Sequence, residues 1–150
     1  MIKKPKLVLL RSSIDHLLPV VKEFAFLNRE RGLKFFFELE VVSDDLCYNE
    51  LIDNYNPDII AFFYHPLLTK KIKIEGIDVN NMVPKIGLMS VDEISPERYI
   101  VVNYFESCSV HAIFSIGSSI SNYYPSLTNK IYYWPWFINE NDTYDFNFFG

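Results

Sequence analysis

Glycine is scarce in this chain, with five residues at positions 32, 76, 87, 117 and 150. None of them forms a GxGxxG after the first expected strand, and no GxxxxGK[ST] is present, which excludes a dinucleotide fingerprint and a P-loop. The stretch Gly117-Ser118-Ser119 also lacks the GxSxG elbow of serine hydrolases. A self-contained enzyme of one of these common classes is therefore not expected.

Cysteine and long apolar runs are equally sparse. Cys47 and Cys108 lie far apart and outside any metal-binding spacing, so we expect two buried thiols in a reducing cytosol, with no disulfide and no metal. No apolar run reaches the roughly twenty residues that a membrane helix needs. Lys3 to Lys6 lead straight into a short expected strand, so no signal peptide is expected either. These features predict a cytoplasmic protein without a transmembrane segment.

A positively charged surface is also lacking. The formal net charge is −5 and the pI is about 5.1, which argues against a nucleic-acid partner. Basic residues cluster only at residues 3–6 and at Lys70, Lys71 and Lys73. The first cluster is a solvated end of the chain, whereas the second could contact an anionic membrane surface or substrate.

The chain is rich in apolar and aromatic residues, which make up 49% and 17% of it. This composition is ample for a packed core and excludes disorder, because disordered chains are poor in aromatic and branched residues. A length of 150 residues fits one domain and leaves little room for two.

Strands and helices are expected to alternate along the chain. Apolar runs predict six strands, at residues 6–10, 34–42, 59–64, 85–90, 110–115 and 131–134. Helices are predicted between them, from Leu17 to about Arg31 before Gly32, from a cap at Asp44 or Asp45 to Tyr55, from Ser95 to about Phe105, and from Ser119 to Tyr124. This alternation predicts an α/β, Rossmann-like open parallel sheet with helices on both faces.

Ligands of such sheets bind beyond the carboxyl ends of the strands, where the strand order reverses. In the usual order the first and fourth strands are neighbours. The loops after these two strands carry Asp15-His16 and Asp92-Glu93. We therefore expect these four residues to form the rim of a crevice.

His16 and Asp92 are the candidate catalytic residues. An imidazole beside Asp15 could abstract a proton from a substrate hydroxyl, although a loop histidine can equally be bonded to nearby backbone. Asp92 and Glu93 could orient a hydroxylated substrate or support a base. They could equally be turn residues ahead of the next helix.

The candidate substrate-binding residues lie in the same loops and after the third strand; they are Arg11, Ser12, Asp15, Glu93 and His65. Arg11 could contact an anionic group or form an ion pair within the acidic rim. His65 is expected to lie farther from the crevice, where a structural role is favoured. Trp134-Pro135-Trp136 could stack on sugar rings or pack a domain hinge, and the hinge is favoured.

Three stretches of the chain resemble GT-B glycosyltransferases. The segment from Val83 to Asp92 is similar to the strand-then-Asp segment of this fold, in particular of the group related to CgeB-type spore-maturation proteins. The pattern from Phe114 through Tyr123-Tyr124-Pro125 to Trp134-Pro135-Trp136 is again similar. Residues 144–150 alternate polar and aromatic residues, and they resemble the first strand of the second domain.

The resemblance implies two Rossmann-like domains that face each other across a cleft. Residues 1–138 would form the N-terminal, acceptor-side domain, and residues 139–150 the linker and first strand of a C-terminal domain. The implied partners are that donor-binding domain and a sugar or glycan acceptor. A nucleotide sugar would be the co-substrate, without a metal or other cofactor, and His16 or Asp92 would face the acceptor hydroxyl. In one departure from the family, Arg11-Ser12-Ser13 replaces a glycine-rich turn.

A second resemblance leads to another class of protein. Asn56-Pro57-Asp58-Ile59-Ile60 looks like the third strand of receiver or cobalamin-binding domains. A receiver needs an acidic pair after the first strand and an aspartate at the end of the third, where this chain has Arg11-Ser12 and Tyr64-His65. Cobalamin binding needs DxHxxG, which is missing. A non-catalytic, receiver-like interaction or ligand-binding module therefore stays the alternative.

Overall fold

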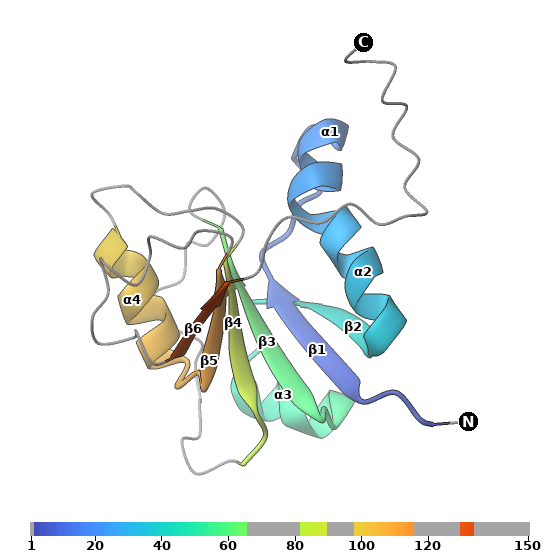
Figure 1. The fold of residues 1–150 in the computed structure, drawn as a ribbon, viewed down its shortest axis with the longest axis vertical. Coiled ribbons are helices and arrows are strands. Elements are labelled where there is room, and N and C mark those ends of the chain that lie inside the picture. Colours follow the sequence, from blue (N-terminus) through green and yellow to red (C-terminus); the bar gives the residue numbers. More distant parts are fainter. Residues whose placement is uncertain (1, 66–81, 90–97, 116–129, 134–150) are drawn as a thin grey trace.

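The computed structural model describes residues 2–65, 82–89, 98–115 and 130–133. Within these ranges one sheet is built from β1 (Lys6–Arg11), β2 (Glu38–Ser43), β3 (Ile59–Tyr64), β4 (Lys85–Met89), β5 (Ala112–Ser115) and β6 (Ile131–Tyr133). The strand order is β2-β1-β3-β4-β5-β6, and every neighbouring pair is parallel (Figure 1). The predicted α/β, Rossmann-like open parallel sheet is therefore confirmed.

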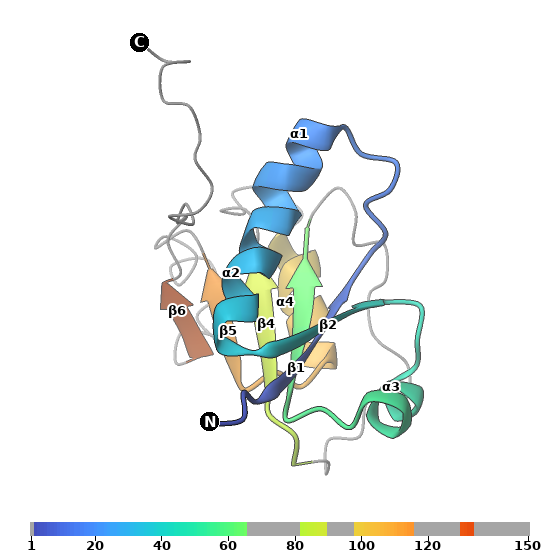
Figure 2. The same ribbon diagram turned by 90° about the vertical axis from the view of Figure 1, so that its right-hand side faces the viewer.

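Helices cover both faces of this sheet. They are α1 (Pro19–Lys22), the π-helix η1 (Glu23–Leu27), α2 (Asn28–Phe36), α3 (Tyr48–Tyr55) and α4 (Arg98–Ser107). The continuous rod α1-η1-α2 lies on one face and α4 on the other (Figures 1 and 2). In the described part of the chain no helix is long and apolar enough to cross a membrane.

The two central strands are buried on both sides. Leu7 to Leu10 of β1 are each at most 1% exposed, and Ile60 to Tyr64 of β3 are at most 4% exposed. Alternate side chains of these strands enter two cores. Phe26 packs with Leu7, Leu9 and Phe63 beneath the α1-η1-α2 rod. The core on the opposite face is larger and includes Tyr48, Leu51, Tyr104 and Phe105 from α3 and α4. Burial on both faces explains why β1 and β3 are continuous apolar runs.

The first helix is longer than its sequence predicts. Pro19 occupies the first turn, as expected, but the prediction that Gly32 ends the helix is wrong. The helix continues to Phe36, and the Phe37 N–H still donates to the Leu33 carbonyl at 2.9 Å. The second strand therefore begins at Glu38 rather than at residue 34. A glycine inside a helix costs about 1 kcal/mol, and tertiary packing offsets that cost here because Gly32 is buried.

The cap of α3 also differs from the prediction. The helix begins after Cys47, whose N–H donates to Glu50 Oε2 at 3.2 Å, so neither Asp44 nor Asp45 is its cap. Asp45 instead accepts a hydrogen bond from Ser43 Oγ at 3.1 Å. The helix ends as such helices commonly do, at Asn56 with a left-handed φ of 43°.

α4 packs very closely against β4. A Cβ atom at Gly87 would lie 2.5 Å from Cε1 of Phe105, nearer than non-bonded carbons approach. Phe105 is fully buried, and its ring is tilted against that of Tyr104, with centroids 5.5 Å apart. Glycine at position 87 therefore allows the ring to touch the strand backbone.

Several predicted features lie outside the described residues. They are the basic cluster Lys70, Lys71 and Lys73, the start of the predicted helix at Ser95, the helix at residues 119–124, the cluster Trp134-Pro135-Trp136 and the strand-like segment 144–150. The division into residues 1–138 and 139–150 depends on this last segment and stays a prediction.

Candidate functional site

The strand order places the switch point between β1 and β3. From β1 the chain passes to β2 on one side, while β3 pairs with β1 on the other. β4 pairs with β3 and β5, so the prediction that the first and fourth strands are neighbours is wrong. Ligands of doubly wound sheets bind beyond the carboxyl ends at such a point. The candidate site is therefore formed by the segments that follow β1 and β3.

The strand order changes where two groups of predicted residues lie relative to the switch point. His65 directly follows β3 and therefore lies at the switch point, contrary to the expectation that it lies farther away. Asp92 and Glu93 are outside the described residues. They follow β4, and β3 lies between β4 and β1. The predicted rim of Asp15-His16 and Asp92-Glu93 therefore does not come from neighbouring strands.

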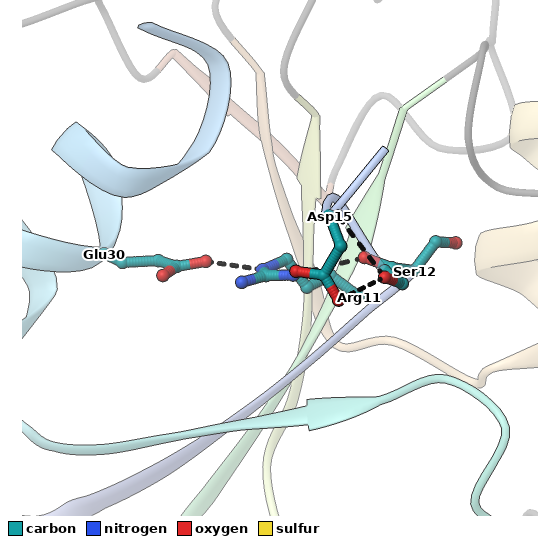
Figure 3. A network of polar contacts seen from close by, with 5 residues as sticks. Arg11, Ser12, Asp15 and Glu30 are labelled. Atoms are coloured by element: carbon teal, nitrogen blue, oxygen red, sulfur yellow. Dashed lines mark hydrogen bonds and ion pairs between the residues drawn. The ribbon is translucent and has the colours of Figure 1, made fainter. Parts of the chain in front are cut away.

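Arg11, the last residue of β1, forms an ion pair at the switch point. Its Nε donates to Glu30 Oε1 of α2 at 2.5 Å (Figure 3). The two side chains are 15% and 11% exposed, respectively. Arg11 Nη1 also donates to the Ser12 carbonyl at 3.2 Å. The ion pair predicted for Arg11 is present, but its partner comes from the helix that covers the sheet rather than from the acidic loops.

Ser12 connects the end of β1 to the turn after β2. Its Oγ donates to Asp44 Oδ2 at 2.6 Å, and the Asp44 N–H donates to the Arg11 carbonyl at 3.2 Å. Asp44 is 8% exposed. Its charge contributes to raising the pKa of Tyr104 in α4, although burial of the phenol is the larger cause. Ser12 and Asp44 therefore bring a hydroxyl and a carboxylate to the α4 side of the switch point.

Asp15 and His16 both lie exposed on the turn that follows β1. Asp15 accepts a hydrogen bond from Ser13 Oγ at 3.2 Å, so its carboxylate has a serine partner within the turn. The buried side chain of Ile14 anchors the turn, and the Leu17 N–H donates to the Ile14 carbonyl at 3.0 Å. His16 is thus presented to solvent at the carboxyl edge of the sheet.

His65 and Arg29 form the buried part of the site. His65 is 8% exposed, and its ring centroid lies 5.5 Å from that of Phe26. Arg29 is 6% exposed, and its guanidinium lies 6.0 Å from the ring centroid of Phe63. Burial lowers the pKa of His65, and the positive charge of Arg29 lowers it further. Burial also lowers the pKa of Arg29 to about 10, which leaves the guanidinium charged at neutral pH.

Three consecutive polar residues of this region were not predicted from the sequence. Asn28, Arg29 and Glu30 are 6%, 6% and 8% exposed, although charged side chains are rarely buried without a partner. A signal for them was present. Val21 and Ala25 are apolar residues at the four-residue spacing that predicts a helix. The same helical spacing leads next to residues 28 and 29, where the sequence has polar side chains instead.

A π-helix directly precedes this polar stretch. Residues Glu23–Leu27 form η1, and the Asn28 N–H donates to the Glu23 carbonyl five residues earlier. π-helical turns inside α-helices occur frequently at functional sites. Such a turn accommodates an extra residue, so it changes the direction in which the following side chains point. η1 therefore helps to set which residues of α2 face the end of β3.

Two other features lie away from the switch point. His111 precedes β5, and its Nδ1 accepts a hydrogen bond from the Lys85 N–H at 3.1 Å, which gives it a structural contact at the amino edge. Cys47 and Cys108 are thiols that are not joined by a disulfide; Cys108 is buried and Cys47 is partly buried. Within the described ranges no group of three or more His, Cys, Asp or Glu side chains could hold a metal ion.

An apolar hollow of about 280 Å³ lies beside α2 on the sheet. Its lining residues are Gly32, Leu33, Phe36, Phe37, Ile86, Leu88 and Phe114. These side chains offer no hydrogen-bonding group to a hydroxylated or charged ligand. The chemistry of the described residues is therefore concentrated at the switch point instead.

The chain matches no protein-family model, no curated protein sequence and no solved structure. What the fold defines is a Rossmann-like α/β domain with a polar site at the carboxyl ends of β1 and β3. That site holds two guanidinium groups, an imidazole, a hydroxyl and two carboxylates within one region. It can bind a polar or anionic group, with an exposed imidazole on the adjoining turn.

Proposed function

We propose that this chain is the N-terminal, acceptor-side domain of a nucleotide-sugar-dependent glycosyltransferase. The observation that carries the proposal is the polar site at the carboxyl ends of β1 and β3 in a Rossmann-like parallel sheet. A GT-B enzyme uses such an edge to face a second domain. The resemblance of residues 83–92 and of the segment that ends at Trp136 supports the same class.

In this proposal His16 accepts the proton of the acceptor hydroxyl. Its exposure on the turn after β1 suits a group that must meet a substrate arriving from solvent. A general base has to come within hydrogen-bonding reach of the hydroxyl. Arg11, Ser12 and Asp15 are the substrate contacts that we propose beside it, with Asp92 and Glu93 from the part of the sequence that follows β4. The nucleotide sugar would be held by a donor-binding domain that joins this one.

The experiment uses the full-length gene product and a panel of nucleotide sugars with hydroxylated acceptors. Replacing His16 by Ala should lower the rate of sugar transfer about 10²- to 10⁴-fold, the range of general-base contributions. His111→Asn is the matched control, because the amide oxygen can still accept the hydrogen bond from the Lys85 N–H. Equal transfer rates for the wild type, His16→Ala and His111→Asn would remove His16 from the chemistry.

A second candidate is a non-catalytic, receiver-like ligand-binding module. The strand order β2-β1-β3-β4-β5 favours it, because flavodoxin-like domains share this order and bind their ligands at the β1/β3 switch point. The two candidates differ in turnover. A module of this kind would bind its ligand through Arg11 and Ser12 without transferring a sugar from any nucleotide donor.

A further inference from the structure

Positively charged and ionisable groups from three elements meet at the end of β3. Arg11 from β1 lies 6.0 Å from the Phe26 ring centroid, and His65 lies 5.5 Å from the same centroid. Arg29 of α2 lies 6.0 Å from the centroid of Phe63, which itself lies 5.1 Å from that of Phe26. Two phenylalanine rings in tilted contact are therefore surrounded by two guanidiniums and an imidazole.

Around Phe26 and Phe63 the two guanidiniums are accompanied by one carboxylate, whereas the other carboxylate of the site, Asp44, is bonded to Ser12. Glu30 is the carboxylate of the cluster, and it is bonded to Arg11. Arg29 and His65 have further contacts within the domain. Burial makes a guanidinium costly to hold as a charge, and the lowered pKa of Arg29 reflects this cost. A bound anion would reduce it.

Local geometry favours a ligand over a purely structural role. The three polar residues of the stretch 28–30 follow η1 directly, and two of them reach the β1/β3 switch point, where Glu30 contacts Arg11 and Arg29 contacts Phe63. This point is where ligands of doubly wound sheets bind. The neighbouring Arg11 and Ser12 are only partly buried, and Ser13, Asp15 and His16 are exposed, so the site can be reached from the carboxyl edge.

We infer that the carboxyl ends of β1 and β3 bind an oxyanion group of the ligand, with Arg29 as its principal contact and His65 and Arg11 beside it. A guanidinium matches phosphate and carboxylate because its N–H groups can donate two parallel hydrogen bonds to two oxygens. Glu30 holds Arg11 in place and is not displaced. The inference rests on the site of the proposed function but does not depend on sugar transfer.

The direct test is an NMR titration of the chain with sodium sulfate, sodium phosphate and sodium glucuronate in turn, at constant ionic strength and pH. The chain has three histidines, and the exposed His111 at the amino edge serves as the internal control for His65. We expect the ring resonances of His65 to shift saturably while those of His111 do not. Saturation by sulfate and phosphate alone identifies a phosphate-type group, and saturation by glucuronate alone identifies a carboxylate.

Two variants of α2 separate this site from general charge effects. Arg29→Met should weaken binding by about tenfold or more, the loss expected when one charge-assisted hydrogen bond is removed. Lys34→Met removes an exposed charge from the same helix and should leave binding unchanged. If Arg29→Met does not fold, Arg29→Lys keeps the charge but loses the paired donors, so weaker binding is still expected.

Two results would overturn the inference. One is the absence of a saturable shift of His65 with all three anions. The other is equal affinity in the wild type and in a folded Arg29 variant. Both are measured on the isolated chain without any donor, so either can occur whether or not the full-length protein transfers sugar. Conversely, loss of transfer in His16→Ala would not bear on anion binding at Arg29.

Discussion

Gly87→Ala should destabilise the domain, because β4 and α4 leave no space for a methyl group. The added Cβ would lie 2.5, 2.7 and 3.0 Å from three ring carbons of Phe105. The ring is fully buried, with Tyr104 at 5.5 Å and Tyr64 at 6.2 Å between centroids. It therefore cannot swing into solvent to relieve the contact. β4 cannot yield easily either, since it pairs with strands on both sides.

Overpacking of this kind costs about 1–3 kcal/mol. For a domain of 150 residues, each kcal/mol lowers Tm by about 2–4 °C. The assay is urea unfolding followed by far-UV circular dichroism, with a thermal scan of the same samples. The expected result is a lower midpoint with an unchanged slope, because the folded structure keeps its compactness.

The control for this prediction is a double-mutant cycle with Phe105→Leu. Leucine lacks Cε1 and Cζ, two of the three ring carbons that meet the new methyl, so Gly87→Ala should cost less in the Phe105→Leu background. A coupling of about 0.5–3 kcal/mol is the range for residues in contact. A loss below about 0.5 kcal/mol for Gly87→Ala alone, which is typical of surface substitutions, would refute this account of the packing between β4 and α4.

Three further predictions concern the polar groups. Glu30→Gln should lower the free energy of unfolding by about 1.5–3 kcal/mol, because it weakens a charge-assisted hydrogen bond to the largely buried Arg11; urea unfolding measures this, and an unchanged midpoint would contradict it. The pKa of His65 is lowered in the folded state relative to about 6.5 in the unfolded chain, so the unfolded chain binds more protons and stability should fall as the pH drops below about 6.5. His65→Gln should flatten that dependence between pH 7 and 5, and parallel curves for both proteins would count against it. Lys85 is 1% exposed, so Lys85→Met, which keeps the side-chain volume, should have a free energy of unfolding within about 1.5 kcal/mol of the wild type. Lys85→Ala should lose about 2–5 kcal/mol, because it leaves a cavity. Similar losses in both variants would show that the amine rather than its stem stabilises the core.

The strands were largely predictable from the sequence because the central ones are buried on both faces. The prediction of residues 59–64 agrees with the bounds of β3, where a continuous apolar run leaves no polar position. Gly32 misled the prediction of the first helix, since local propensity favours an end at glycine and tertiary packing does not. The strand order could not be read from the pattern, because an alternation of strands and helices is the same whichever side of β1 the third strand takes.

The candidate site was predictable in part. Arg11 and Ser12 follow a strand that is easily recognised, and both do form polar contacts at its end. His65 was placed wrongly because its position depends on the strand order. Arg29 and Glu30 were missed because charged residues on an amphipathic helix are usually assigned to the solvent face. The direction of a helix after a π-helical turn cannot be read from a 3.6-residue period, which assumes an uninterrupted α-helix.

η1 also bears on how this domain could diverge. A π-turn takes up one extra residue within the helix, so loss of a single codon within residues 23–27 would restore regular α-helical bonding there. Arg29 and Glu30 would keep their places at the end of β3, because the turn rather than the remainder of α2 absorbs the change. η1 is therefore a position at which this helix could change its length by one residue without exchanging the side chains at the switch point. Paralogues that differ by one residue at η1 would be expected to keep the same ligand.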